Sequence, residues 1–362
     1  MAAGGPYLRP VGLLYGDIAR TAVAEESALP LSNTGISFTH MDVISGGNNT
    51  SARRLVATTD LAKSDDKHVR QLLGRITEPR NDIAGLSLGR PLLMGIVNVT
   101  PDSFSDGGRF ASGKNAIRQG RLLAAEGADI VDIGGESTRP GAETVSEQEE
   151  HDRVNHVVAT LSKENFCVSV DSRRSVIMRE ALASGAQIIN DISALEFDPQ
   201  SVSVVAEARC PVVLMHVKGE PKTMQDNPRY DDVVTEVYDY LAGRVEVAVA
   251  AGIDRSRIVV DPGIGFGKTF AQNLELLEHL TLFHMLGVPI LVGASRKGFI
   301  GAVTGVSDAS KRAAGSVGAA LASVMQGVQI LRVHDVAETG QAIKVWRRAS
   351  GFGDKSVVGE HI

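Results

Sequence analysis

The chain has 362 residues, a formal net charge of −6 and 43% hydrophobic residues, which suits an α/β barrel of about 250 residues with an appended segment. The acidic balance argues against a nucleic-acid-binding protein, which usually presents a basic surface. No apolar run approaches the ~20 residues that cross a bilayer, and the first residues lack a signal-peptide pattern, so we expect no membrane span and a cytoplasmic location. Cys167 and Cys210 each begin an expected strand and are expected to be reduced core thiols.

Residues 1–88 lack the strand–helix rhythm of the remaining chain. They contain one strand-like run at 36–44 and a short amphipathic pattern at 67–77, with apolar residues at helical spacing. We expect a small, partly ordered N-terminal extension that packs on the barrel or on a second subunit. Its sequence carries no recognisable chemistry. A short hairpin at 86–90 is expected to lead into the first barrel strand.

From Pro91 onward, apolar runs alternate with helical patterns. Glycines follow several of the expected helices, where a left-handed residue is favoured, and Ser146 with Glu149 fits a capping box. Strands rich in Ile and Val without alternation indicate burial on both faces, as in parallel sheets. Eight βα units in succession predict an α/β fold, a TIM (β/α)8 barrel over 89–350, followed by a C-terminal tail at 351–362; a doubly wound sheet is the alternative. The helices are expected at 113–126, 146–162, 174–184, 199–208, 230–251, 271–286, 308–326 and 336–349.

Each of the eight apolar runs ends in polar residues. A parallel barrel gathers the C-terminal ends of its strands at one mouth, where the active sites of such barrels lie, so these side chains are expected to converge. In chain order they are Asn98, Asp132 with Glu136, Asp171, Asn190 with Asp191, His216, Asp261, Ser295 with Arg296 and Lys297, and Arg332 with His334 and Asp335.

Three loops after strands are distinctive. Residues 98–110 combine an amide, hydroxyls, carboxylates and a Gly pair, as in a loop that closes over a substrate. Residues 134–146 place Arg139 at a tip where it clamps an anion or is simply solvated. The third loop, DPGIGFGKTF, fails the phosphate-loop pattern at Pro262 and the dinucleotide fingerprint at Lys268. Its glycines are expected to allow a tight backbone path.

The inward polar residues divide by chemistry. Asp171, Asn190, Asp261 and Lys297 mix acceptors and donors and suit a flat heterocycle with an amide–amine edge. A second set of Asn98, Arg332 and His334 suits an anion, with a metal helping. The pattern leaves His216 open between a core residue and a site residue. No cluster has the ligand spacing of a zinc site.

Seven segments together resemble the dihydropteroate synthase family: MGIVNVTPDSFSDGG, DIGGESTRPGA, SVDS, IINDIS, MHVKGEPKTMQ, DPGIGFGK and GASRKGFIG. The likeness covers about 90–345, with the family's order and spacing, and leaves the N-terminal extension outside. It implies a transferase of folate biosynthesis that joins 7,8-dihydropterin-CH2 pyrophosphate to p-aminobenzoate and releases pyrophosphate. It also implies a homodimer, and inhibition by sulfonamides, which mimic p-aminobenzoate.

The resemblance also implies residue roles. Asp171, Asn190, Asp261 and Lys297 would hold the pterin, with Met215 packed against it. Asn98 would coordinate Mg²⁺ on the pyrophosphate, which Arg332 and His334 would bind. The residues implied to close the site are Asp106, Thr138 and Arg139, and those implied to border the aminobenzoate pocket are Phe104, Pro140, Phe266, Ser295 and Arg296. Those implied to act most directly in catalysis are Asp106, Arg139, Lys297, Arg332 and His334.

Two other functions stay open on sequence grounds. A methyltetrahydrofolate-dependent methyltransferase that serves a corrinoid protein shares the pterin pocket, but requires neither the loop STRPG nor the pair Arg332 and His334. A catalytically silent relative would keep a pterin-binding or structural role. Such a chain would be expected to lose loop or anion residues, and all the matched ones are present.

Overall fold

The structure is a computed structural model of the chain. It describes residues 5–45, 52–99, 108–136, 144–220 and 222–353, apart from the side chains of 108–112.

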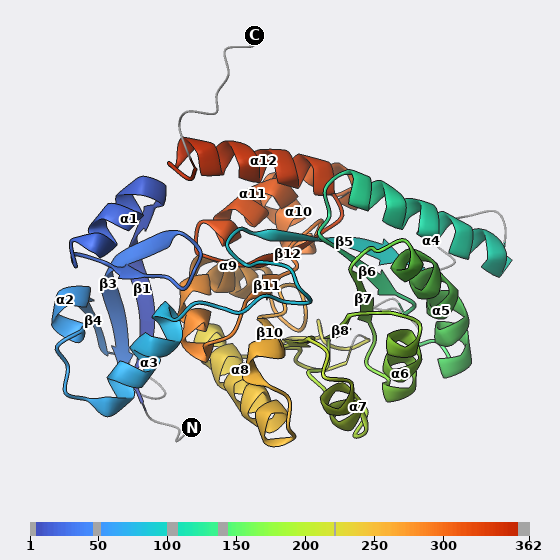
Figure 1. Cartoon of the computed structure of the whole chain (residues 1–362), viewed down its shortest axis with the longest axis horizontal. Coiled ribbons are helices and arrows are strands. Elements are labelled where there is room, and N and C mark those ends of the chain that lie inside the picture. Colours follow the sequence, from blue (N-terminus) through green and yellow to red (C-terminus); the bar gives the residue numbers. More distant parts are fainter. Residues whose placement is uncertain (1–4, 46–51, 100–107, 137–143, 221, 354–362) are drawn as a thin grey trace, which may run out of the picture.

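Eight parallel strands form a closed barrel (Figure 1). Each strand pairs with the next in the chain except the sixth with the seventh, and the last pairs with the first. A parallel bridge between Val260 and Ile290, one residue before the seventh strand, completes the ring. The predicted TIM barrel is therefore confirmed, because a doubly wound sheet would leave two open edges. The strands are β5 (Leu92–Asn98), β6 (Ile130–Gly134), β7 (Val168–Asp171), β8 (Ile188–Asp191), β9 (Val212–Met215), β10 (Ile258–Asp261), β11 (Leu291–Val292) and β12 (Ile330–Val333).

Helices surround the barrel, and three of them differ by several residues from the predicted ranges. The helix expected at 113–126 already begins at Gly108. The helix expected at 271–286 is α-helical only to Glu278 and continues, after His279, as a 3-10 segment. The helix expected at 308–326 starts at Ala313, and an unpredicted helix before it stops at Gly305, whose φ is 74°. These are α4 (Gly108–Ala125), α5 (Glu147–Lys163), α6 (Ser175–Ala183), α7 (Ser201–Ala208), α8 (Val233–Ala250), α9 (Phe270–Glu278), η3 (Leu280–Leu286), α10 (Gly298–Thr304), α11 (Ala313–Val324) and α12 (Val336–Ala349).

The expected caps are present in part. Gly127, Gly185 and Gly252 follow their helices with φ between 94° and 106°, as a left-handed terminus requires. The Ser146 hydroxyl accepts a hydrogen bond from the Glu149 amide at 3.2 Å. The Glu149 carboxylate pairs with Arg153, so the structure shows one half of the predicted capping box.

An apolar layer fills the N-terminal end of the barrel, and the segment that precedes β5 covers it. Ile83 and Leu88 of this segment are 1% exposed and belong to the same cluster as the strand residues. Paired backbone hydrogen bonds join Ile83 and Leu86, so the hairpin lies at 83–86, earlier than predicted. With this end blocked, a ligand can enter only at the opposite mouth. The strand residues of the layer are Leu92, Met94, Ile130, Ile188, Val213, Val259, Leu291 and Ile330.

In its described residues, the N-terminal extension is an antiparallel sheet with three helices. Its central strand pairs with β1 on one side and with β2 and β4 on the other. The strand and helix expected at 36–44 and 67–77 both form. The elements are β1 (Tyr7–Tyr15), α1 (Gly16–Ala24), β2 (Leu29–Pro30), β3 (Ile36–Ser45), β4 (Ala52–Ala57), α2 (Thr58–Leu61) and α3 (Lys67–Thr77).

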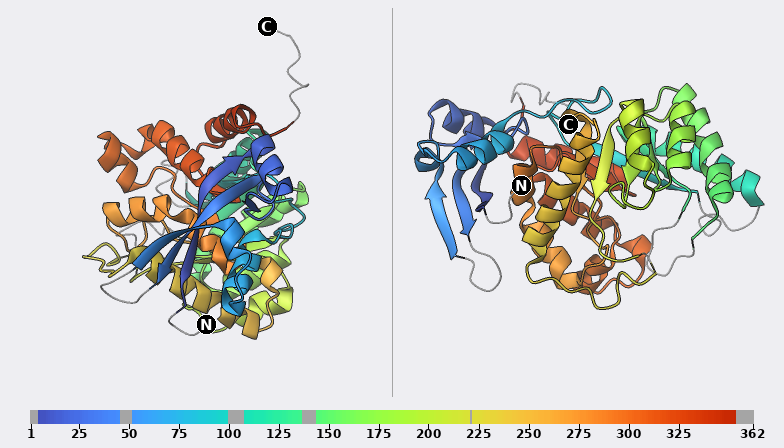
Figure 2. Two further views of the ribbon diagram at one scale, coloured as in Figure 1. Left: turned by 90° about the vertical axis from the view of Figure 1, so that its left-hand side faces the viewer. Right: turned by 90° about the horizontal axis from the view of Figure 1, so that it is seen from below.

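The extension packs on the side of its own barrel, against α8, η3 and α12 (Figures 1 and 2). The Tyr7 hydroxyl donates to Asp239 at 2.8 Å, and its ring meets Tyr238 edge-on. Buried Arg80 donates to the His284 carbonyl at 3.2 Å. Leu8 and Met41 share one core cluster with Leu282 and Met285. Extension and barrel therefore have a continuous hydrophobic core.

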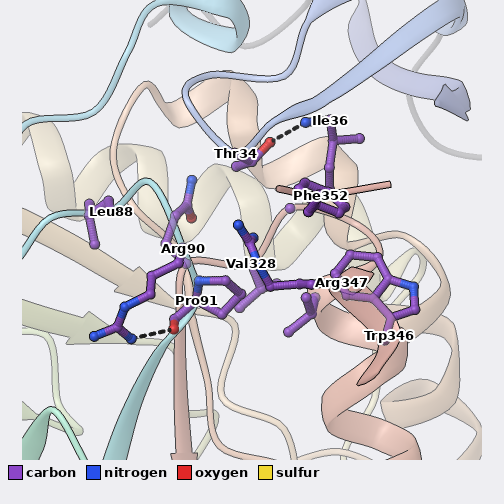
Figure 3. Close-up of a pocket in the computed structure, with 12 residues that line it drawn as sticks. Thr34, Ile36, Leu88, Arg90, Pro91, Val328, Trp346, Arg347 and Phe352 are labelled. Atoms are coloured by element: carbon purple, nitrogen blue, oxygen red, sulfur yellow. Dashed lines mark hydrogen bonds between the residues drawn. The ribbon is translucent and has the colours of Figure 1, made fainter. Parts of the chain in front are cut away.

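Figure 3 shows the seam between the two parts, where Thr34, Leu88, Trp346 and Phe352 surround a small cavity. Its volume is about 10 Å³, roughly what a single water needs. The seam therefore offers no room for a substrate.

None of the described helices has the length and apolar character to span a membrane.

Candidate active site

A cavity of about 930 Å³ opens at the C-terminal mouth of the barrel, opposite the blocked end. Its lining brings together members of both predicted polar sets. Asn98 and Asp171 reach it from the ends of β5 and β7, and Arg332 reaches it from β12. The predicted residues that line it are Asn98, Asp171, Phe266, Ser295, Arg296, Lys297, Arg332 and His334.

A buried network of charges forms around Arg332 on this side of the barrel. Its Nε donates to Asp132 at 2.6 Å and its Nη2 to Asp171 at 2.8 Å. The Asn190 amide nitrogen donates to the same Asp132 oxygen at 3.1 Å. Arg332 belongs to the predicted anion set and contacts Asp171 of the predicted heterocycle set, so it connects the two sets.

Asp132 is the main residue of this network that the sequence-based sets omit. It is 0% exposed, and its Oδ1 has no hydrogen-bond partner among the described residues. It ends an apolar run and is therefore among the polar residues that the sequence places at the barrel mouth, although neither chemical set includes it. Its pairing with Arg332, two hundred positions away, is a property of the barrel and not of the local sequence.

Burial controls the ionisation of these groups. It raises the pKa of Asp171 although Arg332 opposes the shift, and it raises the pKa of Asp261 to about 6. Burial also disfavours the charge on Arg332, but Asp132 and Asp171 outweigh it, so its pKa lies above the usual range. The ionised form of a carboxylate buried in this way is stabilised by a ligand that donates N–H hydrogen bonds to it.

Asp261 begins the glycine-rich loop between β10 and α9. Its Oδ1 accepts from the Gly263 amide at 2.7 Å. Phe266 follows in the loop, and the Lys297 ammonium lies 4.0 Å from its ring centroid, close enough for a cation–π contact. Met215 is 3% exposed and packs with Phe266 and Met224 in a small apolar cluster. The loop thus sets an aromatic face beside a carboxylate and an ammonium.

His334 lies beside Arg332 and is held by Ser295. The Ser295 hydroxyl oxygen accepts from the His334 amide at 3.2 Å and lies 3.0 Å from Nδ1. Burial, with the nearby Arg296 and Arg332, lowers the pKa of His334 to about 3. The ring is therefore neutral, and a Ser295 hydroxyl that donates to Nδ1 leaves the proton on Nε2. The ring can then donate to an anion.

Arg296 has a partner outside the cavity. Its Nε and Nη2 both donate to the Asp335 carboxylate, and its φ of 58° is unusual for a non-glycine residue. This geometry holds the strand-to-helix turn after β11, from which Ser295 and Lys297 face the cavity. The predicted loop residues Phe104, Asp106, Thr138, Arg139 and Pro140 lie outside the described residues.

His216, which the sequence left open, lies behind the cavity. It is 5% exposed, and its Nδ1 lies 2.9 Å from the ammonium of Lys268, itself 1% exposed. Burial lowers the pKa of His216 to about 2, so the ring is neutral. In the sequence, Lys268 only excludes a dinucleotide fingerprint, and no local signal predicts that it pairs with His216.

The chain is similar to known proteins over the barrel. Residues 94–334 match a family described as pterin binding enzyme. A dihydropteroate synthase of Neisseria meningitidis serogroup B is 51% identical over 267 residues, which cover 72% of this chain and 93% of the relative. This chain belongs to the dihydropteroate synthase family.

Solved members of the dihydropteroate synthase family share the barrel. One from Xanthomonas albilineans, with 4-aminobenzoic acid, is 49% identical with a TM-score of 0.72 and covers 76% of this chain and 99% of its own. Another from Yersinia pestis, in a sulfonamide drug complex, is 45% identical with a TM-score of 0.69 and covers 73% and 96% of the two chains. The first 93 residues lie outside the family match.

Proposed function

We propose that this chain condenses 7,8-dihydropterin-CH2 pyrophosphate with p-aminobenzoate to give 7,8-dihydropteroate and pyrophosphate. One observation carries the proposal: buried Asp171 lines the same cavity as Arg332 and His334, the pair proposed to bind the anion, and buried Asp261 ends β10 at this mouth of the barrel. A pterin and a leaving anion need these two environments side by side. The family membership supports the same reaction.

The pterin ring is proposed to lie among Asp171, Asn190, Asp261 and Lys297. The two carboxylates accept its N–H donors, while the ammonium and the amide donate to its ring acceptors. Met215 and Phe266 supply the apolar contact. Because these groups are already desolvated and held by neighbours, little is lost in ordering them when the ring binds.

In the reaction the C–O bond between the methylene and pyrophosphate breaks, and the electron-rich pterin stabilises the positive methylene. The amine of p-aminobenzoate supplies the electron pair of the new C–N bond and loses a proton to solvent or to pyrophosphate. Arg332 and the Nε2–H of His334 stabilise the leaving anion electrostatically, usually the largest catalytic contribution. Nε and Nη2 of Arg332 are held by carboxylates, so Nη1 is the nitrogen proposed to contact the pyrophosphate.

Mg²⁺ is proposed to arrive with the pyrophosphate and to be held by the Asn98 amide oxygen. Among the described residues no three His, Cys, Asp or Glu side chains form a metal cluster. One amide oxygen beside a site for phosphates fits Mg²⁺, which usually keeps waters and substrate oxygens as ligands. Bound there, the ion would neutralise charge on the leaving group.

The remaining assignments are proposals from the family resemblance. Asp106, Thr138 and Arg139 would close the site, and Phe104, Pro140, Ser295 and Arg296 would border p-aminobenzoate or a competing sulfonamide. We propose residues 89–350 as the catalytic unit, with 1–88 as an accessory extension and 351–362 as a tail. A cytoplasmic homodimer is proposed on the same basis.

The direct test is pyrophosphate release by the purified protein with the pterin substrate, p-aminobenzoate and Mg²⁺, omitting each in turn. Release that requires all three, together with dihydropteroate formation, is the expected result. Pterin binding without release would contradict the proposal and would point to a silent relative. Methyl transfer from methyltetrahydrofolate to a corrinoid acceptor would point to the methyltransferase.

A further inference from the structure

Lys268 is a lysine enclosed inside the protein beside the cavity, in a place the proposed reaction does not use. Its side chain is 1% exposed. The ammonium lies 2.9 Å from the carbonyl oxygens of Gly263 and Phe266 and 2.9 Å from Nδ1 of His216. Three donor hydrogens therefore have three acceptors, drawn from two different loops. A buried ammonium is stable only when it is paired in this way.

The loop that contains Lys268 curls around its own ammonium. Gly263 and Gly267 have φ of 68° and 62°. A Cβ on Gly263 would lie 1.9 Å from the His216 carbonyl oxygen, and one on Gly267 would lie 2.2 Å from that of Lys218. The backbone after β10 thus lies directly on the backbone after β9, and the ammonium fills the centre of this contact.

The curl connects the ammonium to two residues of the proposed pterin site. The Gly263 carbonyl accepts from Lys268, and the amide of the same residue donates to Asp261. The Phe266 carbonyl also accepts from Lys268, while its ring faces Lys297 on the cavity side. Of the two residues proposed to contact the pterin from this loop, Phe266 accepts a hydrogen bond from the buried ammonium directly, and Asp261 is linked to it through Gly263.

We infer that Lys268 is a positioning residue, whose ammonium ties the β9–α8 loop to the β10–α9 loop and thereby sets Asp261 and Phe266 for the pterin ring. The inference rests on the proposed function, because it needs a pterin in this cavity. Burial lowers the pKa of Lys268 to about 7, and Asp261 opposes this shift while Lys297 and Lys218 add to it. In neutral His216, Nδ1 can accept a hydrogen bond from the ammonium of Lys268, and in the other tautomer it can donate one to the uncharged amine.

The test compares Lys268→Met, which keeps the chain length and removes the ammonium, with the wild type. Binding of 6-hydroxymethylpterin is measured by calorimetry well below the melting temperature, together with KM and kcat. We expect the pterin Kd to rise by about tenfold or more, the effect of losing roughly one charged hydrogen bond. A lysine with a purely structural role would lower Tm and leave the Kd of the folded protein unchanged, which would overturn the inference.

Two further variants keep the test decisive. Lys218→Met removes a half-exposed lysine from the neighbouring loop and is expected to leave pterin binding unchanged. His216→Phe removes one acceptor of the ammonium but keeps an aromatic ring against Tyr240. If Lys268→Met does not fold, weaker pterin binding by His216→Phe supports the inference and unchanged binding rejects it. A wild type that binds no pterin would instead reject the proposed function.

Discussion

At the scale of single residues, a buried network around Arg332 connects residues of both proposed sets. One guanidinium is shared by Asp132 and Asp171, and Asn190 donates to the same oxygen of Asp132. Asp132 therefore positions one residue of the proposed anion set and one of the pterin set. In this network the proposed roles of Arg332 and Asp171 are physically linked.

Asp132→Asn should impair catalysis without unfolding the protein. The substitution keeps the volume but removes the charge opposite Arg332, a hydrogen bond of about 1.5–3 kcal/mol. We expect kcat/KM for the pterin substrate to fall by roughly ten- to a hundredfold, by the conversion of about 1.4 kcal/mol per tenfold. Asp129→Asn, immediately before the same strand and paired with Arg90, is the matched control. Equal kinetics in Asp132→Asn and the wild type would contradict this role.

Pterin binding should weaken as the solution becomes acidic. Burial raises the pKa of Asp261 to about 6, so below that pH the carboxyl binds a proton and has less capacity to accept the ligand's N–H groups. The Kd should therefore rise by up to about tenfold per pH unit below about 6. Calorimetry of 6-hydroxymethylpterin between pH 5 and 8 measures this. In Asp261→Asn the Kd should be high over this whole pH range. The part of the pH dependence that comes from the titration of Asp261 should be absent. A Kd that improves towards acid pH would refute the prediction.

At the scale of elements, the site depends on how two loops pass each other. The β10–α9 loop lies so close to the β9–α8 loop that glycine is required, as the His216 carbonyl next to Gly263 shows. The loop is also tied down at its end, where Thr269 and Gln272 form a full capping box at the start of α9. Backbone geometry, more than side-chain size, thus shapes this wall of the cavity.

Gly263→Ala should displace the loop. Its methyl group would overlap the His216 carbonyl oxygen, and a φ of 68° is strained for alanine. We expect a lower Tm and weaker pterin binding, measured by thermal denaturation and calorimetry. Gly243→Ala, inside α8 with no atom within 4 Å of the added Cβ, is the control. It should be neutral or stabilise by up to about 1 kcal/mol. Similar behaviour of the two variants would show that the close approach does not matter.

At the scale of the whole molecule, the extension is a part of the folded barrel and not a tethered appendage. Its sheet covers η3, where Leu282 and Phe283 are 0% exposed and Met285 is 2% exposed. At the other end of the seam, the Asp17 amide donates to the Gly351 carbonyl at 3.2 Å. None of the described extension residues lines the large cavity. We therefore expect the extension to contribute to stability.

Removal of residues 1–77 should leave the 83–86 hairpin in place but expose the apolar surface of η3. Each large apolar side chain brought into water costs about 1.5–3 kcal/mol. We expect a lower Tm and a tendency to aggregate, with KM values close to those of the full chain in any soluble fraction. Differential scanning calorimetry and steady-state kinetics measure the two effects. An unchanged Tm would mean that the observed packing contributes little.

The sequence by itself determined the elements of the barrel and the chemistry of its mouth. Apolar runs that end in polar residues, and glycines such as Gly127 and Gly185 after helices, report local backbone geometry and burial. They therefore predicted the parallel strands and the convergence of Asp171, Arg332 and His334. The family motifs added the reaction. Each of these signals is local, because it depends on residues a few positions apart.

Only the tertiary structure decided which of these residues meet. The ring closes between Val260 and Ile290, and Arg332 pairs with Asp132 across the barrel, through contacts between distant segments that periodicity cannot encode. The break at His279 likewise accompanies the packing of η3 beneath the extension. The enclosure of Lys268 has the same origin, because a buried charge is stable only once two folded loops supply its acceptors.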